Sequence, residues 1–476
     1  MIEQIKSTHG IQFLVGSVKK LCSSLLKYSS LKIVRYITFV VDILLLISVL
    51  MCFLFADVII NSLFKEQIIV AFTKANPTCS LQLGETHYNF LENLVSCDSI
   101  LIRSNDSSFV LRSTNLSIGG IRWFELLAKR EFTLKVFSKT VLYAQKFVYT
   151  FHHSQEEFRS ASIHISIADS ILNSDSIKYY PLVNDEQVFS KSNYRQTRFR
   201  FEIPKLKITG LDFFSFIKGT SYKARDVKAS DLFADILVNM DKPYDKNSSK
   251  PQMPNEFLGQ LKESIKVNSL KIVNGKLKYC ERFAVLAKPG VILFSKVKVN
   301  IRGIANHSDY TDTASVLAEG VFMNSGLMKL KMLIPLTAKE FSLHYSGSLS
   351  NMDVTKLNAF IEPGEHHRIK SGRLQSAEFN INVHSGRSTG TLRVVYDNLS
   401  IAILDKKSGS EKGIFNRVLS FIGKIFVIRG SNLPDENGKM KIGRIKYKRD
   451  PDDYFLQFVW FSLRNGVADV VGFPSK

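Results

Sequence analysis

Three groups of side chains in this sequence have the types that bind metals or move protons. They are the adjacent pairs His152-His153 and His366-His367 and the aspartates Asp450, Asp452 and Asp453. Adjacent residues of a strand point to opposite faces of the sheet, so neither histidine pair is suited to hold one ion. The aspartates precede an apolar helix, where N-terminal capping and the helix dipole account for them.

No motif of a known catalytic class accompanies these residues. The sequence has no nucleophile elbow, zinc-protease histidine pair, P-loop or dinucleotide-binding glycine pattern. We therefore expect a protein that is not an enzyme, with no catalytic residue, no metal ligand and no cofactor.

An apolar segment at Tyr36–Ile60 determines where the rest of the chain can act. A helix of this length, at about 1.5 Å per residue, crosses a bilayer core of about 30 Å. Residues 1–35 carry six Lys or Arg and one Glu, and such a basic flank stays on the cytoplasmic side. We expect an uncleaved, single-pass anchor with its N-terminus inside, and the alternative is a cleaved signal peptide.

The net charge of +21 favours an anionic partner. Anionic lipid headgroups are the expected partner beside a membrane, and the expected topology places the bulk of the chain away from nucleic acid. The alternative is that the charge serves solubility alone. Cys79 and Cys97 would lie outside the cytoplasm and are close enough in sequence to form a disulfide, although geometry decides whether they do.

After the apolar segment, alternating apolar and polar residues indicate strands with one buried face. Strands are expected at Ser80–Leu83, Ser99–Arg103, Phe109–Ile118, Phe132–Phe151 and Arg198–Ile208, as a pair within Lys223–Met240, and then almost to residue 404. Helices are expected at Asn61–Lys74, Trp123–Lys129, from an N-cap at Asn255, and at Phe415–Ile422 and Tyr454–Val471. Many strands with few helices favour an antiparallel sheet.

The expected organisation has six parts. They are a basic tail (1–35), a transmembrane helix (36–60), an N-terminal β region (61–240), a polar linker (241–254), a C-terminal β region (255–404) and a helix–strand–helix cap (405–476). The last helix carries an apolar stripe of Phe455, Phe458, Val459, Leu463, Val467 and Val470. It either covers the end of the sheet or docks on a membrane or partner.

Several short pieces of the sequence resemble AsmA-like bacterial envelope proteins, in a branch of unknown function. The first is LQLGETHYNFLENLVSCDSILIRS, with Gly84 and Tyr88. The others, in order, contain Gly275, Tyr279 and Glu281; Gly347 and Asn358; Gly372 and Phe379; Gly390, Tyr396 and Leu399; and Arg449 and Asp450. The resemblance covers about residues 36–130 and 255–472, and residues 131–254 show no matching motif.

The resemblance implies a protein of the bacterial inner membrane, with its bulk in the periplasm as an elongated, curled β-sheet with an apolar groove. It also implies lipid handling or envelope homeostasis, with phospholipid acyl chains and other envelope proteins as partners. The alternative is a structural or assembly scaffold whose apolar face is a closed core. Both arrangements require the same alternation, so the sequence does not separate them.

Overall fold

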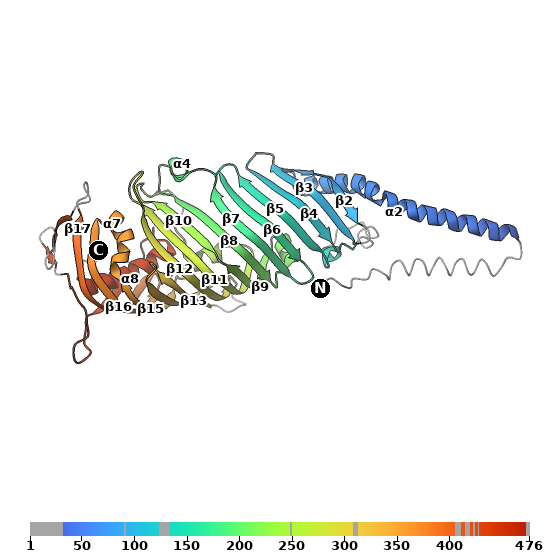
Figure 1. Ribbon diagram of the computed structural model, residues 1–476. Coiled ribbons are helices and arrows are strands. Elements are labelled where there is room, and N and C mark those ends of the chain that lie inside the picture. The colour runs from blue at the N-terminus through green and yellow to red at the C-terminus, as the bar shows by residue number, and fades with distance from the viewer. Residues whose placement is uncertain are drawn as a thin grey trace. The chain divides into compact units, whose positions relative to one another are not determined.

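The computed structural model describes residues 32–89, 92–122, 134–247, 250–307, 313–404, 411–414, 419–421, 424–426 and 428–472 (Figure 1). The described chain is mainly β, with a few helices. It divides into two compact units, Met1–Gln145 and Lys146–Lys476. The short helix expected at Trp123–Lys129 lies outside the described residues.

The first unit combines one long helix with a small antiparallel sheet. Helix α2 (Lys32–Ala75) has 44 residues and contains the expected extension at Asn61–Lys74. The strands are β1 (Cys79–Leu83), β2 (Thr86–Asn89), β3 (Leu94–Ser104) and β4 (Phe109–Gly119). Strand β3 pairs with β1, β2 and β4. The Lys65 Nζ donates to the Gly84 carbonyl (3.0 Å), which ties the helix to the β1–β2 connection.

Among the described residues, no helix combines the length and apolar character needed to cross a membrane. The expected span at Tyr36–Ile60 lies in α2, and the side chains from residue 52 to 64 are outside the description.

A 3-10 turn replaces the first part of one expected strand. Residues Leu134–Phe137 form η1, and β5 (Val141–Phe151) begins only after it. The expected strand was therefore wrong over residues 134–140, and residues 132 and 133 lie outside the described part of the chain. The boundary between the two units falls inside β5.

The second unit is built on long strands (Figure 1). They are β6 (Glu156–Ser166), β7 (Ile171–Pro181), β8 (Thr197–Thr209), β9 (Ser221–Ser230), β10 (Phe233–Asn239), β11 (Ser264–Arg282), β12 (Gly290–Ala305), β13 (Thr313–Phe322), β14 (Gly326–Pro335), β15 (Leu343–Asp353), β16 (His367–His384), β17 (Arg387–Leu404) and β21 (Ile442–Lys448). Short strands are β18 (Glu411–Ile414), β19 (Leu419–Phe421) and β20 (Lys424–Phe426). Helical elements are α4 (Asp185–Ser190), α5 (Phe213–Ile217), α6 (Pro254–Gln260), η2 (Val354–Leu357), α7 (Asn358–Glu365) and α8 (Phe455–Val471).

The sheet of this unit is mixed, not antiparallel as expected. Strands β9 and β10 follow each other end to end and together fill one position between β8 and β11. Both are parallel to β11, because the chain between β10 and β11 returns to the far end of the sheet before β11 begins. Parallel neighbours need such a crossover. The segment expected as a linker, Asp241–Pro254, belongs to this crossover inside the second unit.

Two expected helices differ from the structure. Helix α6 has Met253 as its N-cap, because Pro254 occupies the first helical position and the Glu256 carboxylate accepts from the Met253 N–H (2.8 Å). Asn255 is buried inside the helix and donates to the Ala338 carbonyl instead (2.9 Å). Within the helix expected at Phe415–Ile422, the described residues Leu419–Phe421 form β19, paired with β20, so that prediction was wrong there.

Candidate functional site

One face of the second unit's sheet carries continuous rows of apolar side chains across neighbouring strands. Directly paired residues share a face. Strand β13 pairs without interruption with β14, so Val316, Ala318 and Phe322 point to the same side. Three rows cross the sheet through these residues. The rows are Ile208, Val227, Leu270, Ile301, Val316, Met332, Tyr345 and Ile381; Leu206, Ala229, Ile272, Val299, Ala318, Leu330, Gly347 and Phe379; and Tyr179, Phe201, Ala234, Leu277, Phe294 and Phe322.

The opposite face carries a basic row, and near the ends of β10 and β11 it also carries Leu237 and Cys280, which pack with Phe189 of α4. Beside the first two apolar rows, the paired residues are Asn173, Lys207, Lys228, Lys271, Asn300, Leu317, Lys331 and Ser346. Four of these eight are lysines, and all four are exposed. Along these rows the sheet therefore separates an apolar face from a basic one, as the alternation indicated.

At its C-terminal end the apolar face is sealed by α8, and α6 and α7 pack into the same buried cluster. Tyr345 and Ile381 are 0% exposed beneath this end, and Phe458 of the helix is equally buried. The helix approaches the sheet most closely at Gly466, where a Cβ would come within 2.7 Å of Ile445 Cγ1. Residues of this end belong to one large buried cluster.

The helix matches the expected cap in position but not in every contact. Phe458, Val459 and Val470 are buried as expected, whereas Val467 is 40% exposed. Ser462 and Gly466 occupy buried positions instead, because small residues permit the close approach. The helix begins after Tyr454, whose N–H donates to the Gln457 side chain (3.3 Å).

The aspartates that were expected to cap this helix form hydrogen bonds in the turn before it instead. Asp453 accepts from the Tyr447 hydroxyl (2.8 Å) and from the Asp450 N–H (2.9 Å). These hydrogen bonds therefore stabilise the turn between β21 and α8 rather than the end of the helix.

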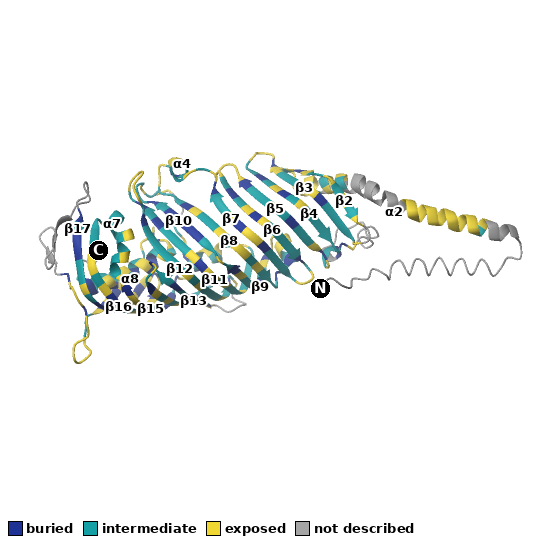
Figure 2. Cartoon of the chain, viewed as in Figure 1, coloured by how far each residue is buried: buried dark blue, intermediate teal, exposed yellow. Residues whose placement is uncertain are grey.

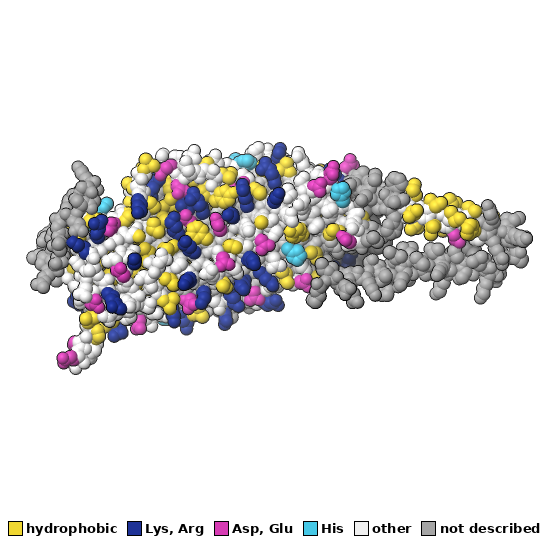
Figure 3. Space-filling view, in the orientation of Figure 1, with side chains coloured by type: hydrophobic (Ala, Val, Ile, Leu, Met, Phe, Trp, Pro, Cys, Tyr) yellow, Lys and Arg dark blue, Asp and Glu magenta, His cyan; other side chains and the backbone are white. Residues whose placement is uncertain are grey.

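Away from this sealed end, the same apolar face is only partly covered. Leu270, Ile272, Leu277 and Ile301 are all half-buried, and Phe199 is 38% exposed. Figure 2 shows intermediate burial over most of β8, β11 and β12, whereas β10 alternates between intermediate and buried residues. Figure 3 shows hydrophobic side chains gathered on the visible face over β8, β10 and β12, with Lys and Arg among them. We call the apolar-face side chains of these four strands the apolar strip.

The apolar strip ends at two charged residues, one on β11 and one just outside β8. On β11 it continues from Leu277 to Tyr279 and then to Glu281, each two residues further along the same face. The row of Tyr279 contains Ile236 and Phe199, and the row of Glu281 contains Val238 and Thr197. Arg195 precedes Thr197 by two residues. Sequence analysis singled out Tyr279 and Glu281 but missed Arg195, which lies in the stretch without a recognised motif.

Tyr279 and Glu281 are in direct contact. The Tyr279 hydroxyl donates to Glu281 Oε1 (2.7 Å). Burial raises the pKa of the Glu281 carboxyl, while this hydrogen bond and the charge of Arg195 lower it. Burial also raises the pKa of Tyr279 well above its usual value, and the neighbouring Glu281 charge adds to the effect. The hydroxyl is therefore protonated at neutral pH and remains a hydrogen-bond donor.

Other motif residues have structural contacts. Gly347 faces Phe379 across the β15–β16 pair, and a Cβ at Gly347 would lie 2.5 Å from the Phe379 ring. Asn358 bridges to β16, because its side chain both donates to the Ile369 carbonyl and accepts from the Ile369 N–H, each at 2.8 Å. These residues explain local packing and point to no ligand.

The remaining motif residues are likewise distributed through the sheet. Gly84 lies between β1 and β2, Tyr88 on β2, Gly275 at a register shift of β11, Gly372 on β16, and Gly390, Tyr396 and Leu399 on β17. The Tyr396 hydroxyl donates to the Arg429 carbonyl (2.8 Å). Arg449 donates to Glu256 Oε1 (2.7 Å) and to the Pro251 carbonyl (2.7 Å), joining the end of β21 to α6.

The Cys79–Cys97 disulfide that the sequence permits is absent. Both thiols are free, and Cys97 is buried. Cys79 pairs with Ser104 at one end of β3, whereas Cys97 is opposite Thr86, seven residues away along that strand. At about 3.3 Å per residue the two are far beyond the reach of a disulfide.

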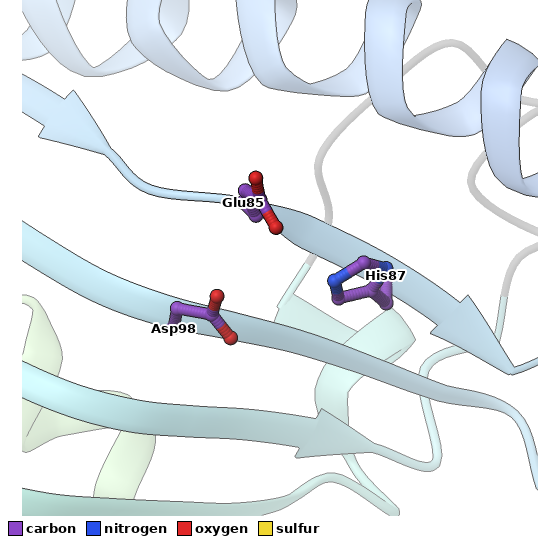
Figure 4. Close-up of side chains that lie close together, drawn as sticks. All are labelled: Glu85, His87 and Asp98. Carbon is purple, nitrogen blue, oxygen red and sulfur yellow. The ribbon is translucent and has the colours of Figure 1, made fainter.

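A group of possible metal ligands lies in the first unit. Glu85, His87 and Asp98 offer ligand atoms within 4.8 Å of one another, from β2, the residue before it and β3 (Figure 4). All three side chains are exposed, and exposed acidic groups often cluster without an ion. Sequence analysis did not single them out, because their proximity comes from strand pairing.

No protein-family model and no curated protein matches this chain.

Proposed function

We propose that this protein handles membrane lipids by holding their acyl chains against the apolar strip. The observation that supports this is an apolar face that is sealed at its C-terminal end and only half-buried over β8, β10, β11 and β12. From Leu270 to Leu277 the strip extends roughly 23 Å along β11. Burial of an acyl chain is favourable by about 0.8 kcal/mol per CH₂, so partial contact along such a strip is sufficient for binding.

We further propose that residues Tyr36–Ile60 anchor the chain in the inner membrane of a bacterial envelope, with the N-terminus cytoplasmic and the bulk periplasmic. The apolar run and the basic flank before it support this topology. Protease added to spheroplasts should digest the chain beyond residue 60 and leave the N-terminal tail protected. Protection of β-rich fragments in intact spheroplasts contradicts this topology.

A scaffold with a closed core is the second candidate function. The buried cluster under α8 supports it, because there the apolar face is fully covered by the chain itself. Lipid and scaffold roles predict different accessibility of the apolar strip.

Photocrosslinking separates the two functions with a matched pair of positions. Ile272 and Val273 are consecutive β-branched residues of β11, so their side chains point to opposite faces. Ile272 belongs to the apolar strip, and Val273 is 40% exposed on the other face. A photoreactive phenylalanine analogue is placed at either position of the full-length chain in its host membrane.

Lipid handling predicts lipid adducts at residue 272 well above those at residue 273, as measured by mass spectrometry after organic extraction. Lipid adducts that stay at the background level at both positions favour the closed scaffold. A melting temperature unchanged from that of the parent chain establishes that either substitution leaves the fold intact.

A further inference from the structure

At the charged end of the apolar strip, Glu281 is a half-buried carboxylate without a cationic partner. Its hydrogen bond comes from the neutral Tyr279 hydroxyl (2.7 Å). Within the described part of the chain, no Lys, Arg or His lies within ion-pair distance of it, and the nearby Glu365 adds negative charge. Glu365 itself is exposed and paired with Arg464 (3.0 Å). A carboxylate in such surroundings favours a bound cation.

Arg195 is the complementary group at the same end. Its guanidinium stacks over the Tyr244 ring (4.1 Å to the centroid), and its Nε donates to the Lys242 carbonyl (3.3 Å). Among the described residues it has no carboxylate partner. These two contacts hold the guanidinium in place while its terminal N–H groups remain available for an anion.

The strands bring Arg195 and Glu281 to the same end of the apolar strip, but the two side chains form no ion pair. Along β8 the apolar face runs through Phe201 and Phe199 to Thr197, and Arg195 follows beyond the end of the strand. Along β11 the same face runs through Leu277 to Glu281, whose row contains Thr197. Arg195 acts on Glu281 through its charge, yet the two are too far apart to form an ion pair. An unpaired anion and an unpaired cation therefore adjoin the end of an apolar surface.

We propose that this end of the apolar strip binds the headgroup of a zwitterionic phospholipid. The phosphate contacts Arg195, the ammonium contacts Glu281 and the Tyr279 ring, and the acyl chains follow the strip towards Leu270. Arg suits phosphate, because its planar fork can donate two parallel hydrogen bonds, and tyrosine faces attract an ammonium group. This inference rests on the proposed lipid-handling function and names the lipid class.

The headgroup preference can be measured with two short-chain lipids that share their acyl chains. Dihexanoyl-phosphatidylethanolamine carries an ammonium group, and dihexanoyl-phosphatidylglycerol does not. Calorimetric titration of the full-length chain in a non-ionic detergent should give a lower Kd for the ethanolamine lipid. Glu281→Gln keeps the side-chain shape and should weaken ethanolamine-lipid binding about tenfold, the loss expected for one charge-assisted hydrogen bond, while leaving glycerol-lipid binding unchanged.

Arg195→Gln should weaken both lipids, because both carry a phosphate. Glu378→Gln and Arg393→Gln are matched controls, since these exposed residues face each other across β16 and β17 on the basic face of the sheet. They should change neither Kd.

The possible failures are distinguishable. Equal affinity for the two lipids, unaffected by Glu281→Gln, overturns the headgroup site and leaves lipid handling in place. Binding of neither lipid, together with background adducts at residue 272, refutes lipid handling itself. Preference for the glycerol lipid also overturns the zwitterionic assignment, because an anionic headgroup then binds at this end.

Discussion

Phe458→Ala should strongly destabilise the second unit, because this side chain fills the centre of the sealed end. Phe458 is 0% exposed, and its ring lies 5.5 Å from that of Phe341 and 5.8 Å from that of Tyr447. Replacing a buried Phe by Ala costs about 3–5 kcal/mol, through lost burial and the cavity left behind. The unit has about 330 residues. With an unfolding entropy of about 2.1 cal/mol/K per residue, a loss of about 4 kcal/mol lowers its Tm by roughly 6 °C.

Leu456→Ala provides the control within the same helix. Leu456 is 66% exposed, so its truncation removes little buried area. Surface substitutions of this kind change stability by about 0.5 kcal/mol or less. Circular dichroism melts of the full-length chain in detergent compare the two variants.

The expected outcome is a large loss for Phe458→Ala and almost none for Leu456→Ala. Equal melting of both variants would refute the assignment of α8 as a cap. A large loss for Leu456→Ala alone would indicate that the helix buries its other side against something outside this chain.

Three further predictions concern other contacts. Burial raises the pKa of Glu157, but its hydrogen bonds and the adjacent guanidinium lower it more, so the folded-state pKa is below the ordinary 4.5. The ionised Glu157 therefore stabilises the fold above pH 4.5, and this stabilisation is lost as the pH falls through the folded-state pKa. Glu157→Gln should flatten the pH dependence of the free energy of urea unfolding between about pH 7 and pH 3. Removing Arg449 or Glu256 should each cost about 1–3 kcal/mol, and a double-mutant cycle measured by urea unfolding should show that the losses do not add. Gly347→Ala should destabilise by at least about 2 kcal/mol through overlap with its neighbours, whereas Gly259→Ala, with nothing within 4 Å of the added Cβ, should be neutral or stabilising in the same thermal melts.

The alternation of apolar and polar residues predicted strands with one apolar and one polar side, but not the shift that brings Ile272 and Leu277, five residues apart on β11, to the same face. Residues Arg198–Ile208 alternate in sequence, and β8 occupies Thr197–Thr209. The helix expected at Tyr454–Val471 also agrees closely with α8, because its apolar residues recur at helical spacing. Local patterns of this kind depend on residues near in sequence, and their structural consequences follow directly.

Features that depend on distant contacts were not predictable in the same way. The parallel pairing of β11 follows from the route of the crossover, which no local pattern specifies. The side of α8 that faces the sheet was also unpredictable. The outer side of the helix is apolar as well, because it carries Leu456, Trp460 and Val467. Spacing alone does not decide which of two apolar stripes faces the sheet.

The segment without a recognised motif contributes one side of the candidate site. Residues 131–254 contain β8, β9 and β10, which supply Phe199, Phe201 and the strand position beside β11. Arg195 lies in the same segment. Its role was hidden because its partner in the proposed site, Glu281, is distant in sequence, and only strand pairing brings them to one end of the sheet.

Whether the apolar face is open or sealed is a property of position along the sheet, not of the sheet as a whole. The row of Ile301 is half-buried on β11 and β12, and the same row becomes fully buried at Tyr345 and Ile381. The strands on both sides have the same alternation, and the difference arises from α6, α7 and α8, whose side chains pack into the buried cluster at one end. A closed core and a lipid-binding surface are therefore compatible in one molecule. The sealed rows form a packed core, and the half-buried rows beside them are the surface on which we propose that acyl chains lie.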